Sequence, residues 1–122
     1  MADPFVQEQF QAQISAGQSL SAQVDIGGWT LVGIIVPATW TTAGISLQAS
    51  YDGGTTWSEL VDQTAAAIGC SSLTGGTLSY FVAVDPTKLR GVRSLKVRSG
   101  TQAAPVVQVG AVTLQLLTRF VY

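Results

Sequence analysis

Residues 45–57 read ISLQASYDGGTTW, and this stretch decides the fold class. Its first seven residues alternate strictly, because the apolar residues at positions 45, 47, 49 and 51 are separated by serine and glutamine. A period of two is typical of a β-strand with one face on the core and the other in water. Asp52, Gly53 and Gly54 then supply turn residues before the chain returns through Thr-Thr-Trp. The stretch therefore predicts a β-strand followed by a hairpin turn.

Residues 50–57 also fit the Asp-box pattern Ser-x-Asp-x-Gly-x-Thr-Trp, which recurs in sialidases and other glycan-handling β-proteins. In such a turn the aspartate accepts backbone hydrogen bonds, glycine supplies positive φ, and the tryptophan anchors the returning strand. Nothing in this arrangement requires catalysis, and in sialidases the motif is a structural hairpin remote from the active site. We therefore predict a structural turn, with the tryptophan packed on the core, formed by Ser50, Asp52, Gly54, Thr56 and Trp57.

Period-two alternation continues in residues 19–26, 77–84 and 94–98, which predicts half-buried antiparallel strands. Residues 29–40 and 106–122 are apolar on both faces, which predicts central strands covered by the core on one side and by a second subunit on the other. Glycine and proline punctuate the strands at short intervals. The sequence thus predicts an all-β fold, a jelly-roll-like antiparallel β-sandwich formed as a single domain by residues 19–122.

The first eighteen residues differ from this pattern. Glutamine recurs at every second position from 7 to 13, whereas Val6, Phe10 and Ile14 are four apart, so strand and helix both fit. We predict that residues 1–18 form an extended N-terminal arm that lies along a neighbouring subunit, and the alternative is a frayed terminus. The arm residues expected to make contacts are Phe5, Val6, Phe10 and Ile14.

Charged residues make up only 11% of the 122-residue chain, less than half of the roughly 25% that is usual for soluble proteins. A nearly neutral surface is poorly protected against association, which favours a chain that works inside an assembly. All seven acidic residues precede all six basic ones in the sequence. Two readings fit this segregation. In the first, charges pair between subunits or a basic patch faces an acidic partner; in the second, acidic and basic strands neutralise each other within one fold.

The basic stretch 88–100, KLRGVRSLKVRSG, lacks the interleaved aromatic residues typical of a nucleic-acid surface. It favours a contact with another protein, and we predict no nucleic-acid partner. The basic residues expected to make that contact are Arg90, Arg93, Lys96 and Arg98.

The sequence excludes the usual catalytic sets. It contains no histidine and a single cysteine, Cys70, which is expected to be a small buried residue. Glu59 and Asp62 could lie close together, as the two carboxyls of a glycosidase do, but an acid pair beside a turn is usually only solvated. We predict no enzyme activity, no catalytic residue, no metal and no cofactor. With no visible signal peptide and no apolar stretch near the ~18 residues that span a bilayer, we expect a chain made in a cytoplasm with no membrane partner.

A second class of protein, a carbohydrate-binding module, is left open by four aromatic residues: Trp29, Trp40, Trp57 and Tyr51. Exposed together, they would form a platform on which sugars stack, as in carbohydrate-binding modules. The preferred reading places them between the two sheets, where most tryptophans of β-sandwiches pack.

Three stretches together resemble a known group of proteins. They are GGWTLVGIIVPATWTTAGISLQASYDGGTTWSELVD (27–62), FVAVDPTKLRGVRSLKVRSGT (81–101) and APVVQVGAVTLQLL (104–117). Their order is similar to that in small proteins of tailed bacteriophages and related prophage-like particles, over residues 27–117. The resemblance implies a β-sandwich virion component, such as a head decoration or cement protein or the base of a head fibre. It implies no enzyme activity and transfers no functional residue.

We therefore expect a homo-oligomer, with a trimer favoured by the resemblance, that binds the major capsid protein on the outer head surface and stabilises capsomer contacts. Its place is the virion, after synthesis in the host cytoplasm. The alternative is a carbohydrate-binding module of a head or tail fibre that contacts the host surface, in which case the partner is a glycan.

Overall fold

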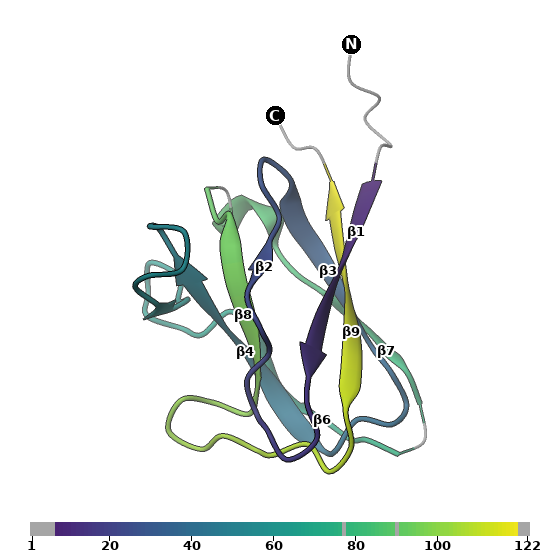
Figure 1. Cartoon of the computed structure of the whole chain (residues 1–122). Helices are drawn as coiled ribbons and strands as arrows, with labels where there is room; N and C mark the ends of the chain where they lie inside the picture. Colours follow the sequence, from purple (N-terminus) through teal and green to yellow (C-terminus); the bar gives the residue numbers. More distant parts are fainter. Residues whose placement is uncertain (1–6, 77, 90, 120–122) are drawn as a thin grey trace.

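The computed structural model describes residues 7–76, 78–89 and 91–119. Within these ranges the chain forms nine β-strands and one short 3-10 helix, arranged as two antiparallel sheets (Figure 1). The predicted all-β class and antiparallel sandwich are therefore confirmed. In chain order the elements are β1 (Gln7–Ile14), β2 (Val24–Asp25), β3 (Thr30–Val36), β4 (Ala43–Ser50), β5 (Ser58–Glu59), β6 (Gly69–Leu73), β7 (Tyr80–Ala83), η1 (Pro86–Lys88), β8 (Ser94–Ser99) and β9 (Val112–Arg119).

The first sheet has the strand order β1-β9-β3-β7, so the last described strand lies between two early ones. Strand β1 pairs with β9 along its whole length, from Gln7 opposite Arg119 to Ile14 opposite Val112. The second sheet has the order β2-β8-β4. The far edge of β4 is shared, because β5 pairs with its last residues and β6 with its first.

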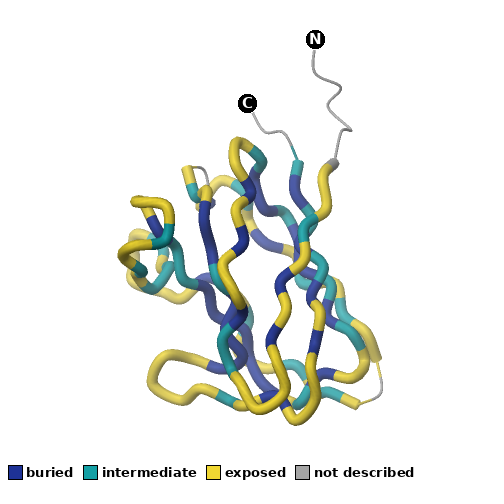
Figure 2. The backbone as a smooth tube through the Cα atoms, viewed as in Figure 1, coloured by how far each residue is buried: buried dark blue, intermediate teal, exposed yellow. Residues whose placement is uncertain are grey.

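The core lies between the two sheets and is built from the inward half of each alternating pattern. Figure 2 shows buried residues alternating with exposed or half-buried ones along much of β1 and β9. In β8 the prediction for residues 94–98 is confirmed, since Leu95 and Val97 are fully buried. Trp40 is also buried, and its indole Nε1 donates to the carbonyl oxygen of Ala43 at 3.2 Å.

The two segments that are apolar on both faces supply the two central strands of the first sheet, β3 and β9, which pair with each other. Their central position confirms that part of the prediction. The register shifts between Leu31 and Gly33, so one extra residue lies in β3 at that point. The shift keeps Leu31 and Ile34 both in the core although they are an odd number of residues apart.

The predicted arm is wrong for the residues that the structure describes. Gln7–Ile14 form strand β1, an integral part of the first sheet, so no boundary separates an arm from the domain at residue 18. Ile14 is 0% exposed and Phe10 packs half-buried against the core. The spacing of four that suggested a helical stripe also places both side chains on the inward face of a strand. Phe5 and Val6 lie outside the described residues.

Two predicted strands are shorter than their patterns. Only Val24–Asp25 of residues 19–26 is strand, because the preceding residues bond irregularly: Ser21 is buried and its hydroxyl accepts a hydrogen bond from the backbone N–H of Val97. Within residues 77–84 the strand is Tyr80–Ala83, and Leu78 remains 62% exposed outside it.

Candidate binding surfaces

The turn after β4 is closed by the side chains of Ser50 and Asp52. Asp52 Oδ1 accepts the backbone N–H groups of Thr55 and Thr56 at 3.1 and 2.8 Å, and Ser50 Oγ accepts that of Gly54 at 2.8 Å. The Thr56 N–H and the hydroxyl of Ser50, which donates to Asp52, lower the pKa of the Asp52 carboxyl from 3.8 to about 2. These atoms brace the loop and offer no free acid for chemistry.

Trp57 does not reach the core as predicted. Its ring is half-buried, its Nε1 donates to the Gly54 carbonyl at 2.9 Å, and Lys96 Nζ lies 4.5 Å from the ring centroid. The ring thus closes its own turn and carries a cation–π contact from β8. With Trp40 in the core and Trp57 covered by Lys96, these two residues do not form the aromatic platform of the alternative reading.

One ion pair within the fold agrees with the second of the two readings of the charge segregation. Arg98 on β8 is 7% exposed, and its guanidinium donates through both terminal nitrogens to the carboxylate of Glu59 on β5. The Arg98 guanidinium lowers the pKa of Glu59 below its ordinary value. Arg98 is therefore wrong as a contact residue, because its side chain is committed to this ion pair.

Of the other basic residues proposed for contacts, Arg93 is exposed and Lys96 is half-buried over Trp57, whereas Arg90 lies outside the described residues. Arg93 borders a hollow of about 450 Å³ at the end of the second sheet, where Tyr51 projects with 85% of its surface exposed. Tyr51 was expected on the core face, but it follows the last residue of β4 and turns outward with the loop.

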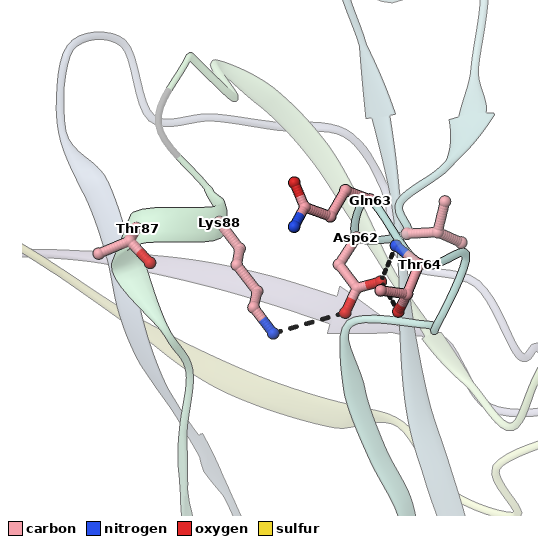
Figure 3. A pocket seen from close by; sticks show the side chains of 6 residues that line it. Asp62, Gln63, Thr64, Thr87 and Lys88 are labelled. Carbon is pink, nitrogen blue, oxygen red and sulfur yellow. Dashed lines mark hydrogen bonds and ion pairs between the residues drawn. The ribbon is translucent and has the colours of Figure 1, made fainter.

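A second hollow, of about 460 Å³, lies between the loop after β5 and helix η1 (Figure 3). Asp62 is at its centre, with Oδ1 accepting the Thr64 hydroxyl at 2.6 Å and Oδ2 lying 3.4 Å from Lys88 Nζ. Bonds from Thr64, first through its hydroxyl, and from the Ala66 N–H lower the pKa of Asp62 to about 2. The carboxylate is thus used by its own loop and by Lys88.

Glu59 and Asp62 therefore have separate partners, Arg98 and the 62–66 loop, and neither is held as a protonated acid. Cys70 is half-buried, and burial raises the pKa of its thiol, which disfavours the nucleophilic thiolate. The described ranges hold no group of three or more His, Cys, Asp or Glu residues that could bind a metal ion. A search for helices long and apolar enough to cross a membrane finds none in the same part of the chain.

The outward face of the first sheet is polar on the side of β1. Gln9, Gln11 and Gln13 point outward from β1, in alternation with residues that face the core. On the neighbouring strand β9, Thr113 and Gln115 point the same way, and Gln9 Nε2 donates to Gln115 Oε1 at 3.0 Å. This half of the face therefore carries neutral amides and a hydroxyl, each of which has both a donor and an acceptor.

The other half of this face is apolar. Leu117 on β9 and Ile35 on β3 are half-buried and point outward, and Phe81 on β7 is 60% exposed. A Cβ atom on Gly33 would lie 2.6 Å from Phe81 Cε1, so the phenyl ring lies directly over the glycine. Ala83 pairs with Gly33 and completes the patch.

Among the described outward positions of β1, β9, β3 and β7, Arg119 is the only charged residue, and it lies at the end of β9. We call these outward residues, without Arg119, the neutral face. The outward side of the second sheet differs, since it carries Asp25, Glu59, Lys96 and Arg98. The neutral face was not identified as a site from the sequence. The glutamines at alternate positions 7–13 are the feature of the sequence that indicates it.

Comparison with known proteins gives no relative: no protein-family model matches the chain, and no curated protein or solved structure matches it.

Proposed function

We propose that the chain is a non-catalytic structural protein that decorates the outer surface of a tailed-phage head. The observation that carries an assembly role is the neutral face, since a surface that combines an exposed apolar patch with uncharged side chains favours association. The resemblance of residues 27–117 to virion proteins supports the phage head as the assembly.

The strand order supports the same class. With β5 and β6 counted together as one interrupted strand, the sandwich has two four-stranded sheets, β1-β9-β3-β7 and β2-β8-β4-β5/β6. We infer from this order that the chain is wound as a jelly roll, an architecture common in viral capsid and lectin domains.

The state of the carboxyl groups supports a role without catalysis. The pKa values of Asp25, Asp52, Glu59, Asp62 and Asp85 are all lowered, chiefly by hydrogen bonds from neighbouring side chains or backbone N–H groups. A general acid needs a carboxyl that keeps its proton near neutral pH, which calls for a raised pKa. These five groups are tuned in the opposite direction, as structural carboxylates are.

For the contact with the major capsid protein we propose the end of the molecule at Tyr51 and Arg93. Both side chains are exposed there beside the 450 Å³ hollow, unlike Arg98 and Ile14, which the fold buries. A protein that binds only the assembled shell shifts the equilibrium toward it by mass action, so decoration stabilises capsomer contacts.

The test is to delete the chain from the genome that encodes it and to image the particles by cryo-electron microscopy. We expect outer-surface density on parental heads, its loss on deletion, and its return when purified protein is added. Arg93→Gln should weaken the return, whereas Gln102→Glu, an equal charge change on an exposed loop, should not. Particles that never contain the chain would end the proposal.

The second candidate function, glycan binding, is favoured by one observation: Tyr51 is 85% exposed beside a hollow that Arg93 also borders. An isolated aromatic ring can stack on a sugar, although the tryptophans do not extend it into a platform. NMR titration of labelled protein with a panel of saccharides tests this function. Binding at this site should shift the ring signals of Tyr51, and the Tyr51→Ala variant should no longer bind.

A further inference from the structure

We propose that the neutral face binds the neutral face of a second copy of the chain, about a two-fold axis that runs across the strands. This inference rests on the proposed function, because it names the partner of the surface that carries the assembly role. It also fits the apolar pattern of β3 and β9. Their outward residues Ile35 and Leu117 are partly exposed to solvent, and a second copy would bury them.

The first argument is the cost of desolvation. Burying an ionised side chain is expensive unless it is paired, whereas neutral amides need only hydrogen-bond partners. Among the charged residues that the structure describes, none lies at an outward position in the middle of this face, and Arg119 lies at one end of it. The outward side of the second sheet, with Glu59, Lys96 and Arg98, is far less suited to burial.

The second argument is self-complementarity, which selects a copy of the same chain as the occupant. Gln11, Gln115, Ile35 and Phe81 lie in one row across the sheet, because the register pairs Gln11 with Gln115 and Ile35 with both Gln115 and Phe81. A two-fold axis along this row places β1 over β1 and β7 over β7. Amides then meet amides, which can pair because each carries a donor and an acceptor, and Phe81 meets apolar surface.

The direction of the axis follows from the same row. An axis along the strands would place the glutamines of one copy over Phe81 of the other and leave buried amides without partners. The axis across the strands also carries Arg119 to the opposite end of the facing sheet, roughly 27 Å from its own copy along the strands, because it lies four residues from the axis at ~3.4 Å per residue. The two cations therefore do not meet.

The third argument is shape. The position of Gly33 beneath the ring lets Phe81 lie flat on the sheet, since any Cβ there would meet the ring at 2.6 Å. A flat apolar surface suits sheet-on-sheet packing, in which two faces approach to about 10 Å.

The size of the face sets the expected strength. Four strands about 4.8 Å apart, with three outward rows, cover roughly 400 Å² per copy, about half of what a standard protein interface buries. We therefore expect a dissociation constant in the micromolar range. An isologous contact closes at two copies, which gives a dimer in place of the trimer expected from the resemblance.

Sedimentation of the purified chain over a wide range of concentration tests the inference. We expect a reversible monomer–dimer equilibrium that Gln115→Glu weakens at least about tenfold, because the axis brings the two new carboxylates together. Gln115→Lys should weaken it similarly, and an equimolar mixture of the two variants should restore the dimer. Gln102→Glu is the matched control on an exposed loop and should dimerise like the parent.

A chain that stays monomeric at every concentration, forms trimers, or dimerises equally well as Gln115→Glu would overturn the inference. Circular dichroism of both variants establishes that they fold, and restoration by mixing requires that they do. The outcome is separable from that of the proposed function. If the chain dimerises but is absent from particles, this inference stands and the proposed function fails. If it binds heads as a monomer, the proposed function stands and this inference fails.

Discussion

Arg98 Nη2 donates to Glu59 Oε2 at 3.0 Å, and this pair joins β8 to β5 across the intervening strand β4. The arginine side chain is only 9% exposed, so the removal of its partner leaves a nearly buried cation. We expect Glu59→Ala to lower the free energy of unfolding by roughly 2 kcal/mol, somewhat less than for a fully buried pair. Urea denaturation of Glu59→Ala, Arg98→Met and the double variant checks this. The double variant should be more stable than the sum of the single effects predicts, and strict additivity would show that the pair contributes no coupling.

Stability should fall in acid between pH 4 and pH 2. Asp52 and Asp62 titrate near pH 2 in the folded chain, below their ordinary value of 3.8. As the pH falls below about 4 the unfolded chain binds protons first, so the stability that both groups contribute at higher pH is lost by about pH 2. The urea midpoint measured across this range should fall less in a variant with Asp52→Asn and Asp62→Asn. An identical fall in parent and variant would contradict the assignment.

The two aspartates should each protect the amides of their own loop. Asp52 accepts the N–H groups of Thr55 and Thr56, and Asp62 those of Thr64 and Ala66. In Asp52→Ala we expect faster hydrogen exchange at residues 55 and 56 with residues 64 and 66 unchanged, and in Asp62→Ala the reverse. Heteronuclear NMR resolves the four amides. Loss of protection at all four in either variant would mean that the loops open together.

Glycine-to-alanine substitutions should destabilise the fold by different amounts in β3 and β4. A Cβ on Gly44 would lie 2.5 Å from the backbone oxygen of Ser71, which cannot move without shifting β6. We expect Gly44→Ala to cost roughly 2–3 kcal/mol, as overpacking between backbones does. A Cβ on Gly33 meets only the exposed ring of Phe81, which can rotate away, so Gly33→Ala should cost less than about 1 kcal/mol. Thermal unfolding of the two variants measures both costs, and equal losses of stability would contradict this account.

The alternation of apolar and polar residues predicted strands well where one face of the strand is exposed to solvent. The pattern of residues 45–51 and 94–98 corresponds to β4 and β8 within a residue or two, with Leu47, Leu95 and Val97 in the core. It failed for residues 19–23, where buried Ser21 is held by β8, a contact 76 residues away that no local pattern contains.

The site residues were harder for the same reason. Alternation places Arg98 on the outward side of its strand, and an outward arginine is normally exposed. Its burial depends on Glu59, which is 39 residues distant in sequence and is brought close by β4. The neutral face likewise exists only once β9 has paired Gln115 with Gln11 and Ile35. The composition indicated that such a surface was needed, but its position depends on the strand order.

The place of β9 between β1 and β3 has a kinetic consequence. Thr118 Oγ1 donates to the Glu8 carbonyl across 110 residues of chain, so the first sheet closes only when its most distant strand arrives. Contacts of such high sequence separation make folding slow, on the order of milliseconds to seconds for β-sandwiches. Until β9 inserts, β1 and β3 both present unpaired edges on which chains can mispair, so the last step of folding is also the step that protects against aggregation.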